Sequence, residues 1–108
     1  MNLDIKGMFD KLKNVQSEIE RMKVELSNRI VTGESGGGMV SVEMTGSHKL
    51  RKIDISDELM LANDKAMIAD LVVAAVNHAY DEADELNKSE MGKIQNFLPN
   101  IPGLNLNL

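Results

Sequence analysis

Apolar residues recur at alternating spacings of four and three residues along the first quarter of the chain. This spacing is a heptad seam, the narrow stripe that a helix packs against one other helix. We therefore expect a long helix over residues 3–28, paired with a second helix of the same chain or of another copy. The seam consists of Met8, Leu12, Val15, Ile19, Met22 and Leu26.

The period of the pattern changes to two after the first helix. Val40, Val42 and Met44 alternate with polar residues, as in a strand that is buried on one face. The segments 29–35 and 48–56 are also extended in character, and short glycine-containing loops separate all three. This arrangement predicts a three-stranded antiparallel β-meander.

The third of these strands has an ambiguous register. Ile53 and Ile55 share one face, and strict alternation would place Lys49 and Arg51 on that same face. A β-bulge is one solution, because it shifts the alternation by one residue. The register is left open at this point.

A second long helix is expected from a cap at Asn63 or Asp64 to about residue 93. Several alanines on this segment would let another backbone approach closely. Residues 1–95 are expected to form one domain, and residues 96–108, with two prolines and no helical period, an irregular and flexible tail. The apolar face consists of Met67, Ile68, Leu71, Val72, Ala75, Ala79, Ala83, Leu86 and Met91.

Three consecutive glycines raise the question of a phosphate-binding loop. Gly33 and Gly38 have the outer spacing of such a loop, but Met39 and Val40 follow where lysine and serine or threonine are needed. The next segment is an expected strand, so no helix N-terminus would face a phosphate. We interpret the glycines as a turn that needs positive φ angles.

Candidate catalytic and metal-binding side chains are few. His78 and Glu82 are four residues apart on the second helix, but one imidazole and one carboxylate are too few for a specific metal site. The acidic run 81–85 is typical of a solvated helix surface. The sequence therefore predicts no catalytic residue, no cofactor and no metal.

Composition indicates one cytoplasmic domain. The chain has 108 residues and no cysteine, and neither a membrane-spanning run nor the apolar core of a signal peptide is evident. The net charge is −5, but residues 1–55 carry nine basic and eight acidic residues, whereas residues 56–108 carry three and nine. A basic surface is therefore compatible with the acidic total.

The basic residues form two groups that suggest phosphate binding. Neither group has the aromatic platform of a single-strand or RNA binder, which leaves duplex phosphates as the expected target. The alternative, that both groups are solubilising surface charge, stays open. The first group would converge if the two long helices pack antiparallel, and it consists of Lys6, Lys11, Lys13, Lys88 and Lys93. The second group lies on the third strand and consists of Lys49, Arg51 and Lys52.

Several separated words of the sequence occur in a familiar order. They are VTGESGGGMV at 31–40, MTG at 44–46, IDI at 53–55, LVVAAVN at 71–77 and the late PG at 102–103. Together they cover nearly the whole chain, and they resemble the YbaB/EbfC family of bacterial nucleoid-associated proteins.

The resemblance implies an α+β domain that forms a tweezers-like homodimer with protruding helical arms. It implies a nucleoid-associated protein that binds double-stranded DNA with little sequence preference, and no enzyme, small-molecule substrate or membrane. DNA contacts of the family are placed on the arms, which favours the helical lysine group over the strand group. The net acidity is a departure from a simple DNA binder.

An alternative function belongs to a different class. The chain could be a dimeric adaptor that binds another protein through the exposed part of the first heptad seam. Met8, Leu12 and Val15 would carry that function if they project beyond the sheet.

Overall fold

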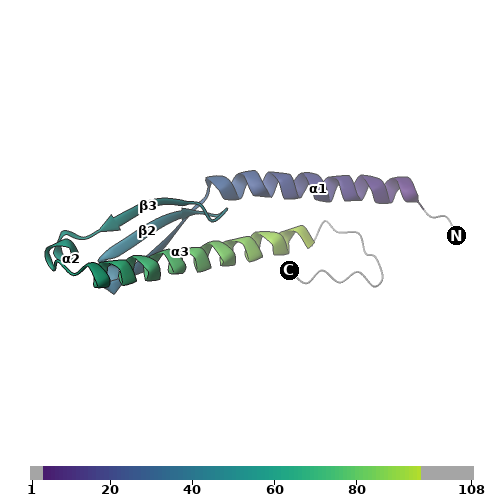
Figure 1. Ribbon diagram of the computed structural model, residues 1–108. Helices are drawn as coiled ribbons and strands as arrows, with labels where there is room; N and C mark the ends of the chain where they lie inside the picture. The colour runs from purple at the N-terminus through teal and green to yellow at the C-terminus, as the bar shows by residue number, and fades with distance from the viewer. Residues whose placement is uncertain (1–3, 96–108) are drawn as a thin grey trace.

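The computed structural model describes residues 4–95 as an elongated molecule, 74 Å by 24 Å by 16 Å in extent (Figure 1). Its elements follow the expected order of a long helix, three strands and a long helix. The expected tail, 96–108, lies outside the described residues. The elements are α1 (Ile5–Asn28), β1 (Ile30–Ser35), the 3₁₀ turn η1 (Gly36–Gly38), β2 (Val40–Thr45), β3 (Leu50–Ile55), α2 (Asp57–Leu61) and α3 (Lys65–Ile94).

Both long helices begin at aspartate caps. The Asp4 carboxylate accepts a hydrogen bond from the Gly7 backbone N–H at 2.9 Å, and Asp64 accepts one from the Met67 N–H at 3.1 Å. Helix α1 ends at Asn28 because Arg29 adopts an extended conformation and leads into β1. The caps fix where the helices start, within two residues of the expected bounds.

The three strands form an antiparallel sheet in the order β1-β2-β3, as expected. Val42 lies opposite Ile53, but Met44 lies opposite Leu50, because the register shifts between these positions. The shift corrects the simple alternation: Leu50, and not Arg51, shares the face of Ile53. The bulge that the sequence left open is therefore present.

Helix α3 covers one face of the sheet over β1 and β2. Val40, Val42 and Met44 of β2 pack with Ala79 and its neighbours in one buried cluster. The small side chains of α3 allow this close packing, as expected from the alanines in its sequence, and the backbone that approaches is that of the sheet. Strand β3 is less well covered, and Leu50 and Ile53 remain exposed.

The glycine run forms a turn between β1 and β2. Gly36, Gly37 and Gly38 all have positive φ angles, of 59°, 66° and 94°. A side chain at these positions would be strained, which explains the three glycines. A strand follows directly, so the turn interpretation is confirmed.

Helix α2 was not expected from the sequence. The Ser56 hydroxyl accepts a hydrogen bond from the Leu59 N–H at 3.2 Å, and Leu59 is buried. Five residues are too few to show a helical period. The only sequence signal is the serine cap followed by Asp57 and Glu58, which favour a helix N-terminus.

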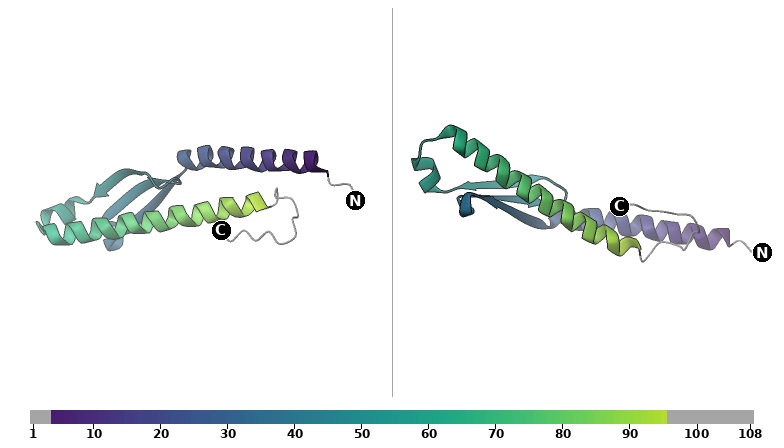
Figure 2. Two further views of the ribbon diagram at one scale, coloured as in Figure 1. Left: turned by 45° about the vertical axis from the view of Figure 1, so that its right-hand side comes forward. Right: turned by 90° about the horizontal axis from the view of Figure 1, so that it is seen from below.

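The two long helices run antiparallel, and the N-terminal part of α1 extends beyond the end of α3 (Figures 1 and 2). Met22 and Leu26 of α1 pack in a second cluster with Ile94 of α3. At the base of this pair, Arg29 Nη1 lies 3.3 Å from Glu90 Oε1, and Asn87 Nδ2 donates to the Gly46 carbonyl at 2.6 Å. These contacts join α1, α3 and the β2–β3 turn.

Candidate nucleic-acid interface

The projecting end of α1 is the most basic part of this helix. We call residues 5–17 the α1 tip. It carries Lys6, Lys11 and Lys13 against a single acidic residue, Asp10, and all four side chains are exposed. Among residues 4–95, none of these three lysines has an ion-pair partner. Their charge is therefore available to an external anion.

Lys88 and Lys93, the two α3 lysines of the helical group, each lie close to a carboxylate of their own helix. Lys88 Nζ lies 3.8 Å from Glu85 Oε1, and Lys93 Nζ lies 3.0 Å from Glu90 Oε1. The Lys93 hydrogen bond, with the charges of Lys93 and Arg29, lowers the pKa of the Glu90 carboxyl, although burial opposes this shift. The two α3 lysines thus share their charge with carboxylates of their own helix.

The antiparallel packing brings Lys93 to the level of Lys11 and Lys13 along the arm, without gathering the helical lysine group into one cluster. Ile94 and Val15 belong to the same buried cluster, so the last turn of α3 lies beside the middle of α1. Lys11 lies about one turn before Val15, whereas Lys13, two residues before Val15, lies on the opposite side of α1 from that packed residue. Lys6 lies nine residues before Val15, about 13 Å farther along the helix. The group is spread along the arm.

The strand group does not form one cluster with the α1 tip. It lies on the sheet, away from the projecting end of α1 (Figure 1). Lys52 Nζ lies 3.3 Å from Asp54 Oδ2, and Lys52 also stands opposite Glu43 on β2. Lys49 and Arg51 make no ion pair with any residue in the described part of the chain. Two of its three charges are therefore unpaired.

The face of the sheet that α3 does not cover carries charges of both signs. Cross-strand pairing places Glu34, Glu43 and Asp54 on this face together with Lys52, and the hydrogen bond from the Thr45 N–H to the Lys49 carbonyl extends the pairing to Lys49. The carboxylates of this face offset its lysines, whereas the α1 tip carries three lysines against one carboxylate.

Sequence reasoning placed Phe9 at the edge of the heptad seam but did not connect it with the lysines of the α1 tip. Phe9 is exposed, three residues after Lys6 and four before Lys13, so the three share one side of the helix. A single ring does not make the stacking platform of single-strand binders. It does place an apolar contact beside two lysines.

The ion pairs on α3 were also overlooked, although the sequence contains a signal for them. Glu85 and Lys88, and Glu90 and Lys93, are each three residues apart within an expected helix. Lys65 was not singled out either. It lies at the start of α3, the end of that helix farthest from Lys93.

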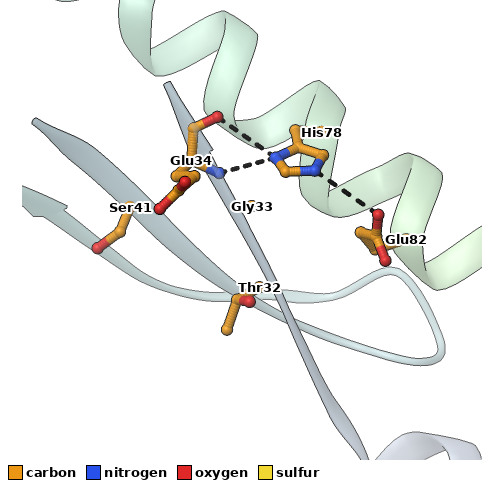
Figure 3. A pocket seen from close by; sticks show the side chains of 6 residues that line it. All are labelled: Thr32, Gly33, Glu34, Ser41, His78 and Glu82. Carbon is orange, nitrogen blue, oxygen red and sulfur yellow. Dashed lines mark hydrogen bonds and ion pairs between the residues drawn. The ribbon is translucent and has the colours of Figure 1, made fainter. Parts of the chain in front are cut away.

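The hollow beside His78 lies where α3 packs against β1, and its polar side chains hold these two elements together (Figure 3). The Glu34 backbone N–H donates to His78 Nδ1 at 2.9 Å, while His78 Nε2 lies 3.6 Å from Glu82 Oε1. Throughout residues 4–95, no three acidic or histidine side chains are grouped so as to hold a metal ion. The imidazole is already engaged in holding the strand to the helix.

No helix within residues 4–95 is both long enough and apolar enough to cross a lipid bilayer.

Comparisons with known proteins identify a family and a similar solved structure. Residues 1–98 match the YbaB/EbfC DNA-binding family. The chain is also similar to a solved structure, the uncharacterized protein HP0035 from Helicobacter pylori. The two are 26% identical, with a TM-score of 0.76, and the similarity covers 87% of this chain and 99% of the other.

Proposed function

This chain belongs to the YbaB/EbfC DNA-binding family, and from this premise we propose that it binds double-stranded DNA mainly through phosphate contacts. The single observation that supports this mechanism is the α1 tip, with three unpaired lysines on an otherwise acidic molecule. In this proposal the protein organises the chromosome as part of the cytoplasmic nucleoid, or changes gene expression there, without catalysis.

Phosphate binding by these lysines is electrostatic. Each lysine that neutralises a phosphate releases condensed counterions, which makes the affinity strongly dependent on salt. Such contacts position a protein on the duplex but do not read its sequence. The net charge of −5 opposes DNA binding outside the α1 tip and keeps the affinity low.

We further propose that two copies associate through an apolar strip beside β3. Leu50 and Ile53 on β3 and Val73 and Tyr80 on α3 are exposed, and within residues 4–95 β3 pairs only with β2. The His48 and Tyr80 rings are 4.4 Å apart, which places Tyr80 on the side of α3 that faces the β2–β3 turn. A dimer through this strip would present two basic arms to one DNA.

Fluorescence anisotropy with labelled duplex DNA tests the proposed function. The titration is repeated over a series of salt concentrations and with several unrelated sequences, on protein whose oligomeric state has been measured by light scattering. We expect the logarithm of the affinity to fall linearly with the logarithm of the salt concentration, with similar values for all duplexes. Absence of binding at about 50 mM salt, where phosphate contacts are strong, would refute the proposal.

A matched single-stranded DNA of the same length is the control for Phe9. Tighter binding to the single strand would indicate stacking in place of duplex phosphate contacts. Weaker binding of the single strand, with a shallower dependence on salt, supports the duplex mechanism.

The adaptor function is a second candidate because Met8 and Leu12 of the heptad seam are exposed on the α1 tip. Helices with such a stripe bind apolar grooves of other proteins. A pulldown comparing the wild type with a Met8→Asp and Leu12→Asp variant tests it. Retention of every partner by the variant would exclude the stripe as the binding surface.

A further inference from the structure

The heptad seam of α1 is covered over only part of its length. Val15 is 7% exposed, whereas Leu12, Met8 and Ile5, which continue the same stripe, are 47%, 40% and 61% exposed. Phe9, at 60%, widens it. These four apolar side chains, Ile5, Met8, Phe9 and Leu12, form what we call the tip stripe. A helix normally buries such a stripe against another apolar surface.

We propose that residues 96–108 of the same chain pack along the tip stripe. This inference concerns the apolar side of the arm, and it does not depend on DNA binding. It identifies an intramolecular contact that would decide whether the stripe is accessible to other molecules.

The first argument is where the segment starts. Helix α3 ends at Ile94, which is 7% exposed and belongs to the same cluster as Val15. The chain beyond α3 therefore continues from the point where the covered part of the seam stops. The tip stripe begins at the next seam position, Leu12, three residues before Val15 along α1.

The second argument is reach. The stripe runs from Leu12 to Ile5, seven residues of helix, or about 10 Å. Thirteen residues follow Gln95, and an extended chain of that length spans up to about 43 Å. The segment is thus long enough to cover the stripe completely.

The third argument is chemical complementarity. Residues 96–108 contain no charged side chain. In the last part of the segment, leucines alternate with asparagines, a pattern that gives an extended chain one apolar and one polar side. The large apolar residues of the segment are Phe97, Leu98, Ile101, Leu104, Leu106 and Leu108.

Charge also distinguishes this occupant from a second α1 tip. Lys6, Lys11 and Lys13 flank the stripe, so two tips packed together would bring like charges into proximity. The uncharged segment covers the stripe without that repulsion. It also leaves the lysines exposed to solvent.

Paramagnetic relaxation enhancement in the full-length protein tests the contact. The chain has no cysteine, so Asn105→Cys gives a single site for a nitroxide spin label. We expect broadening of the amide signals of residues 5–12, with much less at α2, at the opposite end of the molecule (Figure 1). No selective broadening of residues 5–12 would overturn the proposal and leave the stripe available to a partner protein.

A pair of variants tests whether the stripe itself holds the segment. Met8→Asp with Leu12→Asp should abolish the broadening, because both charges fall on the stripe. Asn14→Asp with Ser17→Asp adds the same charge on the other side of α1 and should preserve it. Equal broadening in both variants would overturn the assignment of the stripe.

A mixed sample decides whether the contact is within one chain. Isotope-labelled protein without the nitroxide is combined with unlabelled protein that carries it. Same-chain packing predicts no selective broadening of residues 5–12 in the mixture. Broadening that appears there at full strength would show that the segment belongs to a second copy, which overturns the proposal.

Hydrogen exchange provides a measurement without a label. A chain ending at Gln95 should exchange the amides of residues 5–12 at least about threefold faster than the full-length chain, because the tip loses a packing partner. Amides of β2 should be unaffected. Identical exchange of residues 5–12 in both chains would contradict the contact.

Discussion

Gly33 of β1 lies directly against the backbone of α3 at Ala79, without space for a methyl group between them. A Cβ atom built on Gly33 would meet the Ala79 nitrogen and the Ala75 carbonyl oxygen at distances that real Cβ atoms do not show. Both obstacles are backbone atoms of a helix, so they cannot move aside as a flexible side chain would. This contact sets how closely α3 packs on the sheet.

We expect Gly33→Ala to lower the free energy of unfolding by about 2 to 3 kcal/mol, the usual effect of overpacking a rigid site. Chemical denaturation monitored by circular dichroism measures it. Gly92→Ala is the matched control, since a Cβ there meets nothing within 4 Å. Gly92 lies in the last turn of α3, two residues before its end, so Gly92→Ala should leave the free energy of unfolding unchanged or raise it by less than about 0.5 kcal/mol. Similar effects of the two substitutions would contradict the packing argument.

DNA binding should depend on unpaired lysines more than on total charge. Replacing Lys6, Lys11 and Lys13 by alanine should reduce the slope of log affinity against log salt by about 2.7 for each tip engaged, since each phosphate contact contributes about 0.9. Anisotropy titrations over a salt series measure this slope.

The control for this triple variant removes three lysines that are already ion-paired: Lys23→Ala, Lys52→Ala and Lys88→Ala. Both sets change the net charge equally. The control should retain most of the wild-type slope. An equal loss in both sets would mean that only net charge matters, and the α1 tip would no longer be the interface.

Association through the β3 strip can be tested with two valines of similar exposure. Val73 on α3 is 59% exposed within the strip, and Val24 on α1 is 63% exposed outside it. Val73→Asp should convert a dimer to a monomer in light scattering and weaken DNA binding about tenfold or more, because two linked arms bind more tightly than one. Val24→Asp should change neither property. A dimeric Val73→Asp protein would place the interface elsewhere.

The Glu90 ion pairs should make stability depend on acidity. Lys93, through its hydrogen bond first, and Arg29 lower the pKa of Glu90 below its ordinary value of 4.5. A carboxyl whose pKa is lowered in the folded state stabilises the protein above its unfolded-state pKa, and this contribution is lost as the pH falls through the folded-state pKa. Glu90→Gln should therefore be less stable than the wild type at neutral pH.

The difference in free energy of unfolding between the two proteins, measured by denaturation at several pH values, should shrink as the pH falls below about 4.5. A difference that stays constant over this range would show that the ionised Glu90 carboxylate does not contribute to stability through its pairs with Arg29 and Lys93.

Much of the fold was predictable because its signals are local. The seam from Met8 to Leu26 and the alternation in β2 each reflect the repeat of a single element. Asp64, one of the two residues expected to cap α3, is its cap, and the positive φ angles required glycine at positions 36–38. Helix α2 was missed because five residues contain too little of a period to recognise. The candidate site was predictable in composition, since the lysines were identifiable, but not in geometry.

The sequence by itself determined the two long helices, the three strands and their order, because helix and strand periods depend on neighbours within a few residues, and its words indicated the family. Only the tertiary structure decided that Leu50 replaces Arg51 opposite Met44, and that α3 covers β1 and β2 while β3 stays open. It also decided which lysines project free on the α1 tip. These features depend on contacts between segments far apart in the chain, where the positions of whole elements, and not local periodicity, determine which groups meet.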